Sequence, residues 1–114
     1  MFKVVVIGGK KIPMKSSGRT GRIYSRKFGR DILTDFIKIS SNTADNTGEV
    51  LEDLAWTFAK TANENIPEIE EWLEQFAGMF DVLGAYTDIM ELMGDSFKSN
   101  VNSKKNKLEK KKKQ

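Results

Sequence analysis

The stretch NTGEVLEDLAWTFAKTAN, from Asn46 to Asn63, has the spacing of apolar residues that is typical of an amphipathic helix. Asn46 is followed three residues later by Glu49, which resembles a capping box and predicts that the helix begins here. Its apolar stripe contains Val50, Leu51, Leu54, Ala55, Phe58, Ala59 and Ala62. We expect Leu54 and Phe58, at the centre of this stripe, to face the core.

Trp56 does not belong to this stripe, because the 3.6-residue geometry turns it about 150° away from the centre of the stripe. One explanation is that the N-terminal hairpin or the first helix covers the second side of the helix. The other is that Trp56 anchors an interface, since Trp is enriched among binding hot spots. We favour the covered helix, because a hairpin needs a surface to pack on, and we keep Trp56 as a candidate partner-binding residue.

Downstream, IPEIEEWLEQF (residues 66–76) predicts a second helix that starts at Pro67, a favoured first-turn residue. Its apolar face holds Ile69, Trp72, Leu73 and Phe76, and we expect Trp72 and Phe76 to be buried. The opposite face is acidic. Glu70, Glu71 and Glu74 are candidate partner-binding residues on this face, and no loop has the ligand spacing of a calcium site.

Upstream, FKVVVIGGKKIPMK (about residues 2–15) predicts a β-hairpin, with the β-branched run Val4 to Ile7 followed by the turn Gly8-Gly9. Pro13 cannot donate a hydrogen bond to a neighbouring strand, so the return strand should be an edge.

The next segment repeats an aromatic or aliphatic residue every four positions, at Tyr24, Phe28, Ile32 and Phe36. The apolar face drifts around the helix near Gly29, and Asp31 could cap a new turn. The pattern therefore predicts either one helix bent near Gly29 or two short helices.

A last helix is predicted to carry Leu83, Tyr86, Ile89, Met90 and Met93 on one face. Methionines are usually core residues, but flexible Met-rich faces also suit protein binding, so Met90 is a further candidate contact. Residues 97–114 have almost no apolar content and predict a disordered, Lys-rich tail. The fold class is therefore a mainly α single domain, a small helical bundle over residues 1–96 with an N-terminal hairpin.

The net charge of +3 hides three blocks of opposite sign. Residues 1–30 hold nine Lys or Arg and no acid, residues 31–97 hold fifteen acids and two Lys, and residues 98–114 hold eight Lys and one acid. Arg19, Arg22, Arg26 and Arg30 would lie on one side of a helix, which allows nucleic-acid binding through residues 10–30. The neighbouring acidic block opposes it. Arg22 and Arg26 are candidate contacts in the basic block of residues 1–30.

The chain has no Cys and no His among its 114 residues, so it lacks the commonest general base, the commonest metal ligand and any thiol nucleophile. We expect no enzyme activity, no metal and no cofactor. No apolar run approaches the roughly 20 residues of a membrane span, so no membrane contact is expected.

Three segments together resemble the tail assembly chaperones of long-tailed bacteriophages, in the form common among phages of Gram-positive bacteria. They are Phe-Gly-Arg-Asp at residues 28–31, Leu-Ala-Trp at residues 54–56, and Ile-Pro at residues 66–67 with Glu-Trp-Leu-Glu-Gln-Phe at residues 71–76. The resemblance covers roughly residues 16–94, and the polylysine tail does not belong to the family's pattern.

The resemblance implies a non-catalytic, non-structural viral protein that acts in virion morphogenesis in the cytoplasm of the host bacterium. Proteins of this family are thought to coat the tape measure protein, an elongated and aggregation-prone helical polypeptide, and to recruit the tail tube protein. The resemblance also implies that a ribosomal frameshift can yield an extended product, which only the codons of the gene would reveal. Self-association is left open.

Overall fold

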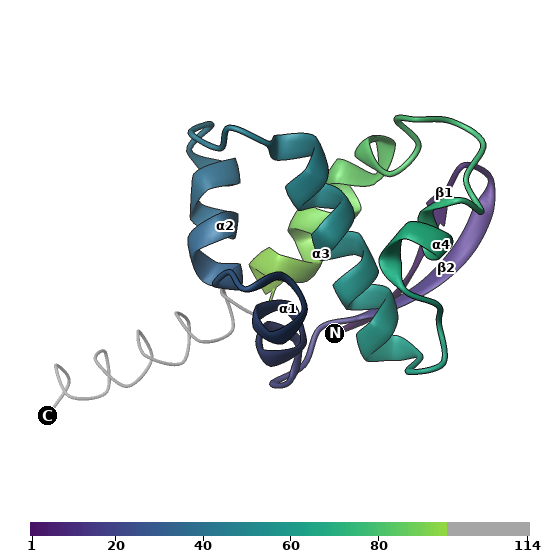
Figure 1. Cartoon of the computed structure of the whole chain (residues 1–114), viewed down its shortest axis with the longest axis horizontal. Helices are drawn as coiled ribbons and strands as arrows, with labels where there is room; N and C mark the ends of the chain where they lie inside the picture. The colour runs from purple at the N-terminus through teal and green to yellow at the C-terminus, as the bar shows by residue number, and fades with distance from the viewer. Residues whose placement is uncertain (96–114) are drawn as a thin grey trace, which may run out of the picture.

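The computed structural model describes residues 1–95, and the predicted disordered tail lies outside this range. The described chain is mainly helical, with a two-stranded antiparallel hairpin at its N-terminus. In Figure 1 one long helix, α3 (Thr47–Ala62), runs through the middle of the molecule, between the hairpin on one side and two short helices on the other. The mainly α fold with an N-terminal hairpin is therefore confirmed.

The hairpin consists of β1 (Phe2–Ile7) and β2 (Lys10–Lys15), joined by Gly8 and Gly9 as predicted. Both glycines have positive φ angles, 56° and 80°, which a two-residue turn of this kind requires. Alternate residues of the two strands, Val5, Ile7, Ile12 and Met14, are buried in the core. Pro13 of β2 pairs with Val4 of β1. In the described residues β2 has no further strand beside it.

The segment after the hairpin forms two helices, α1 (Thr20–Phe28) and α2 (Ile32–Ser40), so the second of the two predicted alternatives is confirmed. Gly29 ends α1 in the left-handed conformation with φ 68°, and its N–H donates to the Ser25 carbonyl oxygen. Asp31 caps α2, because its side chain accepts a hydrogen bond of 2.9 Å from the Thr34 N–H. The drift of the apolar face therefore marks a change of helix.

α3 packs against β2, α1, α2, α4 and the turn η1, so it is the centre of the core. Its predicted start is correct, but Asn46 makes no side-chain capping bond and the capping box is not formed. The reason is local, because Asn46 has φ −133° and ψ 52° instead of the extended conformation that aims a capping side chain at the first turn.

α4 (Ile69–Leu73) is a single short helix, so the predicted helix from Pro67 to Phe76 is wrong at both ends. Pro67 precedes the helix, and its carbonyl oxygen is engaged by α3 instead. Beyond Leu73 the chain continues in tighter turns, in which the Phe76 N–H bonds the Leu73 carbonyl. Trp72 is buried as predicted, whereas Phe76 is only half-buried and stacks edge-on against it.

The chain ends, within the described part, with η1 (Leu83–Ala85) and a helix over residues 86–95. The buried residues of this segment include Ala85 of η1 and Ile89 and Leu92 of the helix. The predicted face is therefore rotated, because Tyr86 is exposed and Leu92 takes its place in the core.

Candidate interaction surface

The side chain of Trp56 brings together three segments that are separate in the sequence. The Phe28 and Trp56 rings lie edge to face, with centroids 5.9 Å apart and planes at 82°. The Trp56 indole Nε1–H donates a hydrogen bond of 2.9 Å to the Pro67 carbonyl oxygen. Phe28, Trp56 and Pro67, which we call the indole junction, thus tie the end of α1, the middle of α3 and the approach to α4 together.

Trp56 is buried at this junction, as the covered-helix alternative predicts. The cover comes from Phe28 of α1 and from the chain around Pro67. The Lys27 and Lys60 ammonium groups lie 5.6 Å and 5.9 Å from the centre of the indole ring. In the described chain Trp56 is consequently a core residue, and its indole is not at the surface for a partner to contact.

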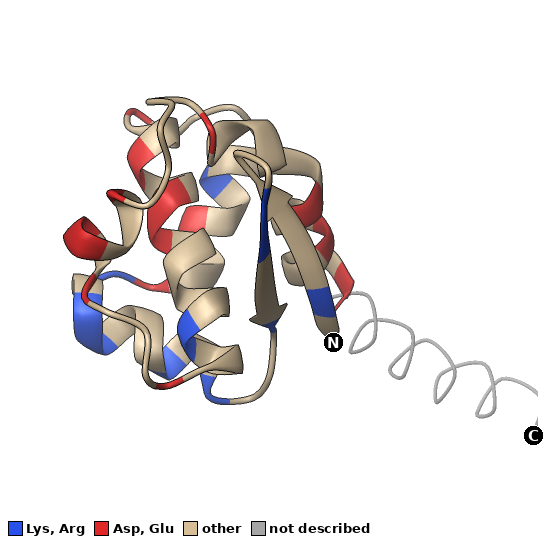
Figure 2. Ribbon diagram, turned by 90° about the vertical axis from the view of Figure 1, so that its right-hand side faces the viewer, with Lys and Arg blue, Asp and Glu red and all other residues tan. Residues whose placement is uncertain are grey.

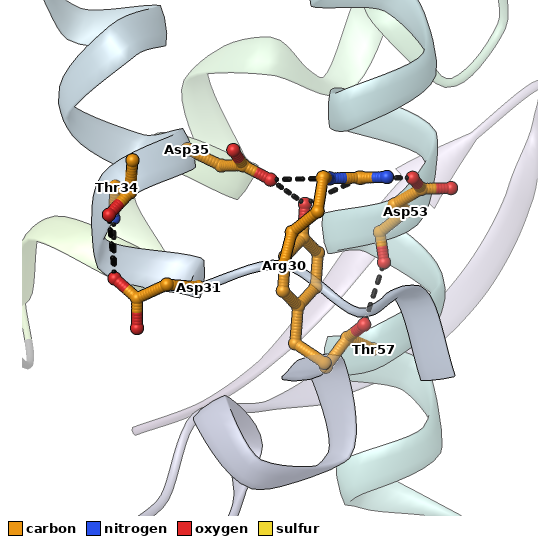
Figure 3. A network of polar contacts seen from close by, with 7 residues as sticks. Arg30, Asp31, Thr34, Asp35, Asp53 and Thr57 are labelled. Carbon is orange, nitrogen blue, oxygen red and sulfur yellow. Dashed lines mark hydrogen bonds and ion pairs between the residues drawn. The ribbon is translucent and has the colours of Figure 1, made fainter. Parts of the chain in front are cut away.

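A polar network beside the junction links the loop after α1 to α2 and α3 (Figure 3). Arg30 donates from Nε to Asp35 Oδ2 over 2.8 Å and from Nη2 to Asp53 Oδ2 over 2.5 Å. The Tyr24 hydroxyl donates to Asp35 Oδ2 over 2.6 Å and accepts from Arg30 Nη2 over 3.0 Å. Within residues 1–95, no buried side-chain polar atom lacks a hydrogen-bond partner.

The network changes the pKa values of its acids in opposite directions. Burial favours a raised pKa for Asp35, but the hydrogen bonds from Tyr24 and Arg30 and the charge of Arg30 lower its pKa below the ordinary value. At Asp53 burial prevails over the Arg30 hydrogen bond, and the pKa is raised. Burial and the bond to Asp35 also raise the pKa of Tyr24, so this phenol stays protonated.

Sequence reasoning missed this network and assigned Arg30 to an exposed basic stripe. A signal was present, because Asp53 lies beside Leu54 within the apolar stretch of α3 and a buried acid needs a cation. A second member of the stripe is also paired, since Arg19 Nη1 lies 2.6 Å from Glu64 Oε1, and the neighbouring Lys27 pairs with Glu68.

Arg22 and Arg26 are the members of that stripe that remain exposed on α1 without an ion pair to a residue of the described chain. The free basic surface on this helix is therefore smaller than the sequence predicted.

The predicted acidic residues Glu70, Glu71 and Glu74 are all exposed on and after α4. Figure 2 shows one group of acidic residues along α3 and α4, on the side away from the N-terminus, and a second group on the helix of residues 86–95, near the N-terminus. Glu71 also lies at a cleft of about 300 Å³ between β2 and α4, whose apolar walls include Ile12 and Trp72. Glu70, Glu71 and Glu74 thus lie together on and directly after α4, whereas Arg22 and Arg26 belong to another helix, α1.

Met90 is half-buried in the helix of residues 86–95 and packs against the core. Part of its side chain is accessible, so its predicted contact with a partner stays a prediction.

The outer face of β1 was not predicted as a site, although its run of apolar residues predicted the strand. Phe2, Val4 and Val6 point away from the core and are exposed. A strand that is apolar on both faces was the available signal, because a half-buried strand normally alternates between apolar and polar residues.

Residues 1–95 contain no group of three or more carboxylate, His or Cys side chains that could hold a metal ion. None of the helices in this range is long and apolar enough to cross a membrane. No match to this chain was found among protein-family models, curated proteins or solved structures.

Proposed function

We propose that this chain is a non-catalytic phage tail assembly chaperone that binds the tape measure protein and helps recruit tail tube subunits in the cytoplasm of the host bacterium. The observation that carries the proposal is the indole junction. Its three residues come from three separate segments of the resemblance, and their side chains and backbone contact one another. A chance resemblance between unrelated short motifs would give no reason for these segments to meet.

The charge distribution supports the same proposal. Glu70, Glu71 and Glu74 add an exposed acidic surface to a domain whose apolar core is already filled by its own residues. Exposed charges favour solubility and form weak contacts that salt screens. Such contacts suit a chaperone that must release its client during assembly.

The proposal is tested by co-expression with the tape measure protein of the same genome. We expect the tape measure protein to move from the insoluble to the soluble fraction and to co-purify with this chain. An unrelated acidic protein of similar size is the control for a general effect on solubility. If the tape measure protein is equally insoluble with and without this chain, the chaperone proposal is wrong.

The second candidate is a small nucleic-acid-binding regulator that uses residues 10–30, and Arg22 and Arg26, which are exposed and have no ion pair within residues 1–95, favour it. It predicts saturable binding to DNA or RNA that falls steeply between two salt concentrations, because bound cations are released from the phosphates. Filter binding with wild type and Arg22→Glu/Arg26→Glu tests it. Binding that is absent, or equal in the two proteins, would reject this candidate.

A further inference from the structure

The hairpin turns an apolar face to solvent. Phe2, Val4 and Val6 are 61%, 48% and 58% exposed, whereas Val5 and Ile7 between them are 1% and 0% exposed. One face of the hairpin therefore packs on the core, and the other leaves three apolar side chains in a row. A two-stranded sheet is normally stable only when packed on other elements, and a bare apolar face of this kind marks an interaction site.

A row of lysines borders the apolar row on the same face. The strand register pairs Phe2 with Lys15, Val4 with Pro13 and Val6 with Lys11, so these residues point outward together. Neither lysine has an ion pair with any residue in the described range 1–95.

The contrast is Lys3, which points to the inner face and lies 2.5 Å from Asp88 Oδ1, with Glu91 as a second partner. The fold thus neutralises Lys3 and leaves Lys11 and Lys15 without an ion pair to any residue in the range 1–95. We call Phe2, Val4 and Val6 with Lys11 and Lys15 the outer hairpin face.

The geometry of the outer hairpin face matches an α-helix. Side chains on one face of a strand repeat about every 6.8 Å, and residues four apart in a helix are separated by about 6 Å along its axis. Three successive apolar positions of a helix can therefore sit beside Phe2, Val4 and Val6. Acidic residues along one flank of that helix would then lie over Lys11 and Lys15.

Other occupants are less complementary to this face. Packing the outer hairpin faces of two copies together would place two uncompensated lysine rows in one interface, and like charges at close range destabilise it. The Lys-rich residues 98–114 carry the same sign of charge as the row. Neither the outer hairpin face of a second copy nor the Lys-rich segment of residues 98–114 offers the row of acids that would match this face.

We propose that the outer hairpin face binds an amphipathic helix whose apolar stripe has acidic residues along one flank. The inference rests on the proposed function only for the source of that helix, which would be the tape measure protein. The chemistry of the face is independent of that source, so the two can be tested separately.

The test is a titration of the isotope-labelled full chain, followed by NMR, with a designed helical peptide of about 18 residues, or five turns. One peptide carries a Leu stripe with a Glu flank, and the matched peptide carries Lys at the same flank positions. We expect the shifts of residues 2–15 to change with the Glu peptide, and the Lys peptide to bind about tenfold more weakly.

Variants of the chain locate the binding. Val4→Thr/Val6→Thr keeps β-branched residues in the strand but removes apolar contacts, and should weaken binding of the Glu peptide about tenfold. Ile37→Thr is the matched control, because Ile37 is 55% exposed on α2, far along the chain from the hairpin. Lys11→Glu/Lys15→Glu, which changes only exposed side chains, should reverse the preference between the two peptides.

Several results would overturn the inference: equal binding of both peptides, shift changes outside the hairpin, or an equal effect of Ile37→Thr. A second copy as the occupant would instead appear in sedimentation as self-association that Val4→Thr/Val6→Thr abolishes. If the Glu peptide binds here but the tape measure protein stays insoluble in co-expression, the docking face stands and the chaperone proposal fails. If co-expression makes the tape measure protein soluble but neither peptide binds the chain, the docking face is rejected and the chaperone proposal stands.

Discussion

Arg30 and Asp53 form an ion pair in which Nη2 lies 2.5 Å from Oδ2, and the Asp53 carboxylate is buried. The same guanidinium pairs with Asp35, which is also buried. One cation therefore compensates two carboxylates on α2 and α3, and neither acid has another cation within ion-pair distance in the described chain.

Replacing Arg30 with Met keeps much of the side-chain volume and leaves both carboxylates without their cation. Removing one partner of a buried pair typically costs about 3–5 kcal/mol, and we expect the lower end because Arg30 itself is one-third exposed. The free energy of unfolding is measured by urea titration. Arg26→Met, at an exposed position, should change it by less than about 0.5 kcal/mol. Equal losses in the two variants would show that the network does not stabilise the fold.

Stability should depend on pH through Asp35. Its pKa is lowered in the folded state, so its contribution is present above the ordinary carboxyl range, around pH 4, and is lost as the pH falls through and below that range. The raised pKa of Asp53 acts with the opposite sign, so the wild-type curve alone does not isolate Asp35. Asp35→Asn should therefore lose more stability, relative to wild type, at pH 6 than at pH 3.

The measurement for Asp35 is urea unfolding of both proteins at the two pH values. Asp45→Asn serves as the control, because Asp45 is exposed and has no ion pair with a residue of the described chain. Its effect should be small at both pH values. A loss for Asp35→Asn that is the same at pH 3 and pH 6 would contradict the lowered pKa.

Two substitutions at Trp56 separate its packing from its hydrogen bond. Trp56→Ala removes a buried aromatic ring and should cost about 3–5 kcal/mol of unfolding free energy. Trp56→Phe keeps a ring against Phe28 but leaves the Pro67 carbonyl without its donor, at a cost of about 1–3 kcal/mol. Chemical denaturation followed by circular dichroism gives both values. If Trp56→Ala unfolds at the wild-type midpoint, the indole junction does not hold the fold together.

Gly29 provides a test of the break between α1 and α2. A side chain there would meet no atom within 4 Å, so Gly29→Ala should cost only the backbone strain of a left-handed residue, about 1–2 kcal/mol. Gly18→Ala is the matched control, because that site is equally open and does not have a positive φ angle. Thermal unfolding of the two variants compares them directly. A wild-type melting temperature for Gly29→Ala would mean that the left-handed conformation at this residue does not strain an alanine.

Local patterns were sufficient to predict the hairpin turn at Gly8-Gly9, the start of α3 and the cap at Asp31, because these features depend on neighbouring residues. The stripe of α3 likewise predicted the burial of Leu54 and Phe58, which are 0% exposed. Periodicity was less useful for α4. Its apolar spacing continues to Phe76, but Pro67 lies outside the helix, and its carbonyl oxygen accepts a hydrogen bond from Trp56, 11 positions away in the sequence.

The candidate site depended on contacts that periodicity does not report. Arg30 and Arg26 share a helical spacing in the sequence, yet the left-handed turn at Gly29 sends Arg30 inward while Arg26 stays exposed. The lysines of the hairpin differ for a similar reason. Only the strand register and the position of the helix over residues 86–95 reveal that Lys3 is paired and that Lys11 has no ion pair within the described part of the chain.

The central place of α3 also determines how the molecule opens. Because β2, α1, α2, α4 and η1 all lie against this one helix, exposing its backbone amides to water requires most of the domain to separate from it. Hydrogen exchange at Leu54 and Phe58 should therefore proceed only through global unfolding, at rates that follow denaturant with the full slope of the equilibrium transition. The termini of α2 and the loop around Met79 should exchange through small local fluctuations, with little dependence on denaturant.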